Sequence, residues 1–210
     1  MTKTIQAISI AAILTVSAFA FPLGIADAMG SFLDVKKAKV GTDSSEFEKA
    51  KFKTKANIPT DGSGGAFGFG IISGAGLEAI AVTTTHPGVL DSEAQSDVND
   101  PVFHNHYVAL QDSLTDGSGL CPGLEVRDIT FQEPGDVDIK NKKAVMEDVP
   151  YYFAGTHSLT DANINFLANE NVGAAVSFTI DPVPSASNIQ AVCINDVAAT
   201  NDLKVKSVND

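Results

Sequence analysis

The sequence is poor in basic residues, and this shortage argues against binding to nucleic acids. Lys and Arg together number 14 against 26 Asp and Glu, which gives a formal net charge of −12 at pH 7. An acidic protein repels phosphate backbones and anionic lipid surfaces. We therefore expect no nucleic-acid partner, and a surface that is compatible with bound cations.

Sustained helical periodicity is nearly absent, and the best short candidate for a helix is residues 160–168. Short runs that alternate apolar and polar residues, and that end at Gly, Pro, Asn or Asp, dominate instead. The expected strands are residues 78–86, 102–110, 124–132, 136–139, 150–153, 174–180 and 189–194. This pattern predicts an all-β fold, a single-domain antiparallel β-sandwich or barrel.

Two common catalytic sequence patterns are missing. The glycine-rich stretch at residues 60–76 has the spacing GxGxxxG from Gly68, which is not the dinucleotide fingerprint, and no amphipathic helix follows it. No GxSxG sequence is present, so the nucleophile elbow of the α/β-hydrolases is absent as well. Glycines inside a strand more often mark a bulge or a close approach between backbones, which is what we expect here.

One long apolar run is present, at the start of the chain. Lys3 precedes it, and Ala26-Asp27-Ala28 places small residues at the two cleavage positions. This arrangement is typical of a secretory signal peptide, so we expect cleavage after residues 1–28 and a secreted or extracytoplasmic protein at the cell surface. A retained membrane anchor is the alternative, because the run is about as long as a bilayer is thick. We expect no other membrane association.

Cysteine is scarce, with Cys121 and Cys193 as the two examples. Outside the cytoplasm an even pair most often forms a disulfide, and closing a loop of about 70 residues stabilises by roughly 4 kcal/mol. A cysteine metal ligand is the alternative. A blue-copper site needs a His shortly after the Cys, however, and no His follows Cys193. We therefore expect a disulfide between the two.

The basic residues that are present gather near the N-terminus. Residues 29–57 form a Lys-rich segment in which lysines alternate at Lys49, Lys51, Lys53 and Lys55. A strand here would carry these lysines on one face. We expect either an edge strand whose charge prevents aggregation between sheets, or a positive strand for self-association with the acidic surface of a neighbouring subunit. The β domain itself is expected over residues 58–210.

Histidine is also scarce, and three of the four histidines lie between residues 86 and 106. His104 and His106 are two apart in a strand pattern, so they project to one face, which they share with Val102, Val108 and Leu110. His86 ends a similar face formed by Ile80, Val82 and Thr84. Two imidazoles on an apolar face are costly unless their nitrogens are satisfied, and a metal ion would satisfy one nitrogen of each. The alternative is a histidine pair on an exposed edge strand without function.

Two short segments resemble the metal motifs of the cupin superfamily. They are FHNHYVALQ at residues 103–111 and VPYYFAGTHSLTDAN at residues 149–163. The resemblance implies a jelly-roll, cupin-like fold, and it assigns the family's ligand positions, in chain order, to His104, His106, Gln111 and His157. No Gly precedes His104 at the family's spacing, and Gln replaces the usual Glu. The chain is otherwise similar to secreted archaeal proteins, which implies no function.

Together these observations predict a secreted β protein with a mononuclear site for one copper, zinc or iron ion. The expected ligands are His104, His106 and His157, with His86 or Gln111 in the fourth position. If the site is catalytic, the metal would act as a Lewis acid or a redox centre toward a small molecule or an oxygen species. The alternative is a non-catalytic cell-surface protein that assembles through its Lys-rich strand and whose histidines are incidental.

Overall fold

The computed structural model describes residues 30–89, 97–185 and 189–208. The expected signal peptide lies outside the described residues. No helix in the described part of the chain is long and apolar enough to cross a membrane. One short 3₁₀ turn (η1, Gly76–Glu78) accompanies the strands β1 (Val35–Thr42), β2 (Glu46–Thr54), β3 (Phe67–Ser73), β4 (Ile80–Thr85), β5 (His104–Asp112), β6 (Leu124–Ile129), β7 (Asp136–Lys140), β8 (Lys143–Pro150), β9 (Tyr152–Thr156), β10 (Asn163–Leu167), β11 (Val172–Pro184), β12 (Ile189–Ala199) and β13 (Leu203–Ser207).

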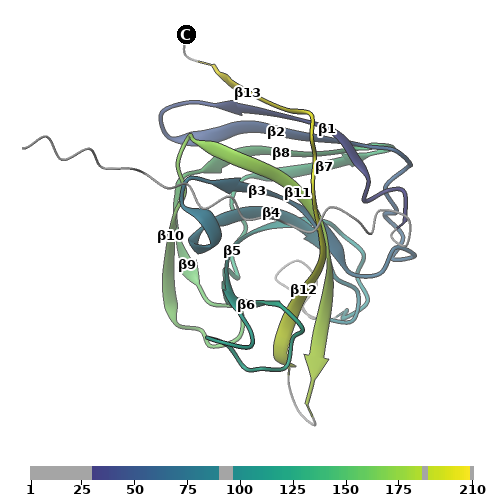
Figure 1. Cartoon of the computed structure of the whole chain (residues 1–210), viewed down its shortest axis with the longest axis vertical. Helices are drawn as coiled ribbons and strands as arrows, with labels where there is room; N and C mark the ends of the chain where they lie inside the picture. Colours follow the sequence, from purple (N-terminus) through teal and green to yellow (C-terminus); the bar gives the residue numbers. More distant parts are fainter. Residues whose placement is uncertain (1–29, 90–96, 186–188, 209–210) are drawn as a thin grey trace, which may run out of the picture.

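The strands form a barrel and a sheet that lies across one side of it (Figure 1). The barrel has the strand order β11-β12-β6-β5-β4-β3 and closes through the antiparallel pairing of β3 with β11. The sheet has the order β13-β1-β2-β8-β7, in which β13 runs parallel to β1. A two-stranded sheet of β9 and β10 completes the fold. The predicted all-β class is therefore confirmed, with a closed barrel and a packed sheet together.

A layer of apolar side chains fills the space between the five-stranded sheet and the barrel. Phe52 of β2 and Phe69 of β3 meet there with ring centroids 5.6 Å apart. Because side chains alternate along a strand, β3 directs Phe67 and Phe69 to this layer and Gly68 to the inside of the barrel. A Cβ atom on Gly68 would lie 2.7 Å from the carbonyl oxygen of Thr83. Gly68 in the glycine-rich sequence thus allows the backbones of β3 and β4 to approach each other closely, as expected.

The Lys-rich segment forms β1 and β2, which are internal strands of the five-stranded sheet. The expected edge position is wrong, because β13 pairs with β1 and β8 pairs with β2, so that β13 and β7 form the edges. The apolar side chains of β2, such as Phe47 and Phe52, are buried against the barrel. Residues 30–57 are therefore part of the same packed core as the rest of the domain.

Residues 160–168, the helix candidate, are not helical. They contain β10, which pairs with β9 so that Phe166 lies opposite Phe153. The ring of Phe166 also stacks on Tyr107 of the barrel, with centroids 5.6 Å apart. Packing of this one aromatic side chain against the barrel favours a strand over the weak helical propensity of the segment.

Candidate metal centre

The inner face of the barrel carries the residues predicted to share a face on β4 and β5. In the register of these strands, Thr84 lies opposite His104, and Val82 lies opposite His106. His106 and Thr84 line the inside of the barrel. Val102, predicted to lie on the same face, precedes β5 and is 49% exposed. The alternation is therefore confirmed within the strands and ends at the first residue of β5.

Three of the four histidines form one buried group. His86, the residue that follows β4, joins His104 and His106, and the ligand nitrogens of the three lie within 4.8 Å of one another. Their side chains are almost completely inaccessible, with relative exposures of 8%, 0% and 3%. Nε2 of His86 lies 2.7 Å from Nε2 of His104. Three imidazoles this close together can bind a single metal ion.

Backbone carbonyls hold the rings of His104 and His106 in place. Nδ1 of His106 donates a hydrogen bond to the carbonyl oxygen of Thr130 at 2.7 Å, and Nδ1 of His104 donates to that of Val102 at 3.2 Å. A carbonyl oxygen can only accept, so the lone pair of each neutral ring is on Nε2. Nε2 of His106 is buried and has no hydrogen-bond partner among the described residues. Metal-binding histidines are typically oriented by such a hydrogen bond from their other nitrogen.

Burial keeps the imidazole of His106 neutral. Burial lowers the pKa of His106 well below its usual value of 6.5, and the neighbouring His104 and His86 lower it further, against a smaller opposing effect of the hydrogen bond to Thr130. The neutral imidazole is the form that binds metals. A buried nitrogen without a hydrogen-bond partner costs about 1–3 kcal/mol, which a metal–nitrogen bond would recover.

A cavity of about 590 Å³ occupies the inside of the barrel and reaches the histidine group. His86, His106 and Thr84 line it where β4 ends and β5 begins. The hydroxyl oxygen of Thr84 is buried there without a hydrogen-bond partner among the described residues. Sequence reasoning placed Thr84 on this face but did not include it in the site. The histidine group is thus adjacent to a space that is large enough for a small molecule.

His157 and Gln111 lie elsewhere along the cavity. Nδ1 of His157 accepts a hydrogen bond from the backbone N–H of Leu159 at 3.0 Å, and its Nε2 lies 3.3 Å from the carbonyl oxygen of Arg127. Gln111 follows His106 by five residues on the same strand, which places it about 16 Å away. The structure therefore brings His86, and neither of these two residues, to His104 and His106.

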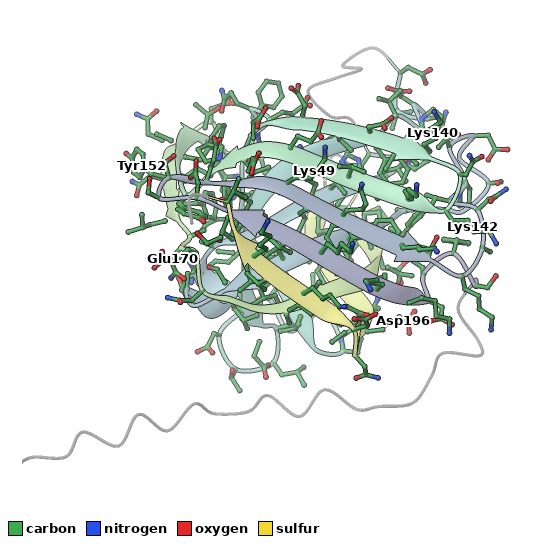
Figure 2. All side chains as sticks on the ribbon, turned by 90° about the horizontal axis from the view of Figure 1, so that it is seen from above. Lys49, Lys140, Lys142, Tyr152, Glu170 and Asp196 are labelled. Atoms are coloured by element: carbon green, nitrogen blue, oxygen red, sulfur yellow. A yellow bond between two sulfur atoms is a disulfide. The ribbon has the colours of Figure 1, made fainter. Side chains whose placement is uncertain are left out.

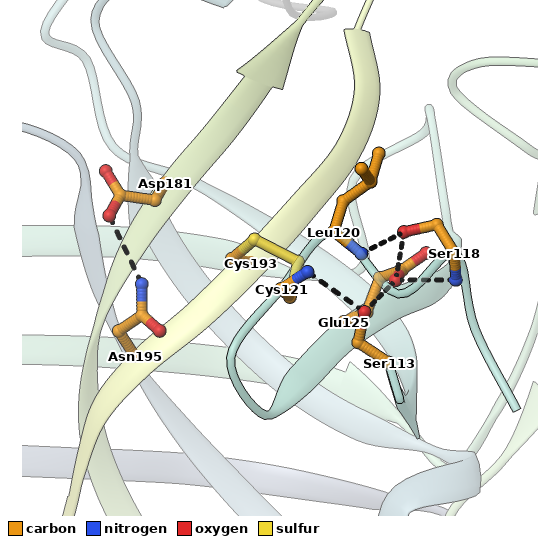
Figure 3. The surroundings of a disulfide bond; sticks show 8 residues. All are labelled: Ser113, Ser118, Leu120, Cys121, Glu125, Asp181, Cys193 and Asn195. Carbon is orange, nitrogen blue, oxygen red and sulfur yellow. Dashed lines mark hydrogen bonds between the residues drawn. A yellow bond between two sulfur atoms is a disulfide. The ribbon is translucent and has the colours of Figure 1, made fainter. Parts of the chain in front are cut away.

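The predicted disulfide between Cys121 and Cys193 is present, and it lies at a seam of the barrel (Figure 3). At this seam β6 and β12 share two residue pairs, Glu125 with Cys193 and Leu124 with Ile194. The hydroxyl groups of Ser113 and Ser118 donate to the carboxylate of Glu125 beside the disulfide, both at 2.7 Å. The hydrogen bonds hold the connection between β5 and β6 against β6, and the disulfide ties this connection to β12 beside the two residue pairs.

The cavity reaches the surface on the side of the seam toward the end of β6 and the beginning of β12. Its wall continues from Arg127 and Ile129 of β6 to Ile189 and Ala191 of β12, beyond the two residue pairs that join these strands. The lining residues also include exposed ones, namely Leu159, Thr160 and Gln190. The cavity is therefore open to solvent beside Leu159, Thr160 and Gln190.

Comparisons with known proteins provide no relative from which a function can be transferred. No protein-family model, curated protein or solved structure matches the chain. The resemblance to the cupin motifs thus remains a prediction from two short segments. Function has to be inferred from the geometry and chemistry of the barrel interior.

Proposed function

We propose that this protein is a secreted metal-binding β-barrel protein with a mononuclear centre formed by His86, His104 and His106. The observation that carries the proposal is the buried Nε2 of His106, which has no hydrogen-bond partner in the described part of the chain while its Nδ1 is held by Thr130. Three imidazole nitrogens are a common ligand set for zinc, copper and iron. The disulfide fits the oxidising environment of a secreted protein.

The spacing of the ring nitrogens fits one ion after a small movement. Two nitrogens bound tetrahedrally at about 2.05 Å from zinc are about 3.3 Å apart. Nε2 of His86 and Nε2 of His104 are 2.7 Å apart, and no pair in the group exceeds 4.8 Å. His86 lies in the connection after β4, where its ring can shift more easily than the rings on β5. When an ion binds, the proton between the two Nε2 atoms would have to move to Nδ1 of His86, so that the neutral ring can offer its Nε2.

Three protein ligands leave at least one coordination position, and in this site it would face the cavity. His86 and His106 line the cavity, and the hydroxyl group of Thr84 lies on the same inner face. That hydroxyl can hydrogen-bond to a group bound at the open position. A metal held here would supply Lewis-acid or redox chemistry to a small molecule or an oxygen species that enters the barrel.

Elemental mass spectrometry of the purified chain tests the metal centre. We expect close to one equivalent of zinc, copper or iron in the wild-type protein and a large loss in a His104→Ala/His106→Ala variant. Circular dichroism of both proteins would show that the variant still folds. The proposal fails if the wild-type protein binds none of the three ions after incubation with each of them.

A second candidate function is assembly through the outer face of the five-stranded sheet (Figure 2). Strands β13, β1 and β2 place seven lysines on this face, namely Lys37, Lys39, Lys49, Lys51, Lys53, Lys204 and Lys206. Lys39 lies opposite both Lys51 and Lys204. Like charges directly opposite each other destabilise a sheet, and an anionic partner would relieve this repulsion. The acidic surface of a second copy fits, because the chain carries a net charge of −12 despite these lysines.

Sedimentation velocity at low and high salt tests this second function. We expect an oligomer at low ionic strength that dissociates as salt screens the charges. A Lys39→Glu/Lys51→Glu variant should be monomeric throughout. A wild-type protein that is monomeric at every salt concentration would exclude self-association through this face.

A further inference from the structure

We propose that the barrel cavity binds an apolar small molecule that carries one anionic head group, such as a carboxylate, with this head group at the histidine end. The position of the head group rests on the proposed metal centre. Binding of the apolar part does not, because it follows from the walls of the cavity alone.

The walls between the histidine end and the opposite end of the barrel are aliphatic and aromatic. Alternate residues of β4, β5 and β11 supply most of this surface, and they form one apolar cluster: Ile80, Val82, Val108, Leu110, Val176 and Phe178. Apolar surface of this kind is favourable to cover with an apolar ligand and offers no hydrogen bonds to a polar one. The ligand's main body must therefore be hydrocarbon.

The size of the cavity also indicates a ligand. Small barrels normally fill their interior with side chains. Here the side chains on the inner face leave a cavity of about 590 Å³ in the barrel. This is within the range of about 300–1,000 Å³ that is typical of small-molecule sites. An interior left open to this extent is costly to fold, and a resident or exchangeable ligand would offset that cost.

Charged residues in the cavity wall determine which end of the cavity the ligand's head group occupies. Glu125 lines the cavity far along β6 from the histidines, and its carboxylate would repel an anionic head group at that end. Arg127 is the one Lys or Arg among the described residues of the wall, but Glu78 and Asp128 hold its guanidinium at 2.7 Å and 2.8 Å. A metal ion on the three histidines would provide the positive charge that an anion needs when it leaves water.

Isothermal titration calorimetry with two ligand series tests the inference. The n-alkanols measure the apolar walls, and the n-alkanoates of equal length add the charge. On metal-free protein we expect alkanol affinity to rise about fourfold for each added methylene group until the cavity is full. Zinc should leave the alkanols unchanged and should tighten the alkanoates at least tenfold.

Two cavity variants locate the binding in the barrel. Leu110→Ala enlarges the cavity and should increase the chain length at which affinity stops rising, whereas Val126→Phe should decrease it. Leu203→Ala, a matched change in the layer between the sheet and the barrel, should have no effect on this length.

The possible results separate the cavity from the metal centre. The proposed site is overturned if alkanol affinity does not depend on chain length. It is also overturned if neither cavity variant changes the chain length at which affinity stops rising. If the alkanols behave as expected but zinc binds without tightening the alkanoates, the head-group assignment is wrong. If zinc does not bind at all, the metal centre fails and the head-group assignment fails with it, while the alkanol series still decides the apolar site.

Discussion

Nε2 of His86 lies 2.7 Å from Nε2 of His104, although the two residues are 18 positions apart. The antiparallel pairing of β4 with β5 produces this contact, because the end of one strand meets the beginning of the next. His106 is the third member of the group. It lies two residues beyond His104 on β5 and therefore on the same face. The residue at the end of β4 therefore decides whether the pair on β5 becomes a three-histidine site.

Substitution of His86 separates this ligand set from the one expected on cupin-like grounds. His86→Ala removes one of three ligands, so we expect metal affinity to fall by more than about 100-fold, since loss of a mere outer-shell partner costs about 10- to 100-fold. His157→Ala should leave affinity nearly unchanged, because both ring nitrogens of His157 already have backbone partners. Competition with a chelator of known affinity measures both. Equal losses in the two variants would contradict the assignment.

The hydroxyl group of Thr84 should cost stability in the metal-free protein. It is buried without a hydrogen-bond partner among the described residues, so Thr84→Val is expected to raise the free energy of unfolding by about 1 kcal/mol. The neighbouring Thr85→Val is the matched control. The hydroxyl group of Thr85 donates to the carbonyl oxygen of Pro101 at 2.9 Å, and its loss should lower the free energy of unfolding by a similar amount. Urea denaturation at pH 7 measures both, and a destabilised Thr84→Val variant would contradict the functional reading of this hydroxyl.

The faces of β4 and β5 could be predicted because each strand buries one face of alternating apolar residues. The same reasoning missed β8, in which Ala144, Val145 and Met146 are consecutive and all buried. It also misplaced the Lys-rich strands at an edge, because no local pattern reveals that β13, from the far end of the chain, pairs with β1. Many of the strands were therefore accessible from the sequence, but the neighbours of each strand were not.

For the histidine site, too, the shared face of a strand could be predicted, but the contact between strands could not. Spacing alone places His104 and His106 on one face. The contact with His86 depends on the register between β4 and β5, which a long connection leaves open, whereas a two-residue turn would have determined it. His157 was favoured by resemblance to a motif, yet its segment is bridged to Thr130, beyond the end of β6, and its Nε2 lies 3.3 Å from the carbonyl oxygen of Arg127 in β6.

The carboxylate of Glu125 makes stability depend on pH at the seam of the barrel. Burial raises the pKa of Glu125, but hydrogen bonds from Ser113, Ser118 and Gln111 outweigh it and hold the pKa below its usual value of 4.5. The unfolded chain then binds this proton at a higher pH than the folded protein does. The stabilisation is therefore complete above the unfolded pKa and is lost as the pH falls through the folded one.

A Glu125→Gln variant isolates this effect from the other carboxylates. We expect the wild-type protein to be more stable than the variant at pH 7, and we expect this difference in unfolding free energy to shrink as the pH falls below about 4.5. Denaturation by urea from pH 7 to pH 3 measures the difference directly. A difference that stays constant over this range would show that the hydrogen bonds do not favour the charged form.

The disulfide should stabilise the fold in two distinguishable ways. Closing a loop with a sequence separation of 72 restricts the unfolded chain, and the loss of that restriction in a Cys121→Ala/Cys193→Ala variant should lower the free energy of unfolding by about 4 kcal/mol. The disulfide also ties the connection before β6 to β12, next to the point where these strands share two residue pairs. Its removal should therefore loosen this wall of the cavity in the folded protein as well.

Hydrogen exchange of the same variant under native conditions distinguishes the two contributions. Opening of the seam predicts faster amide exchange in β6 and in the first half of β12 than the overall loss of stability accounts for, with β1 and β2 as the internal reference. Alkanol binding should weaken in parallel, because the same strands form the cavity wall. If exchange instead increases by one factor throughout the barrel and the sheet, the disulfide acts through the unfolded chain alone, and the seam closes without it.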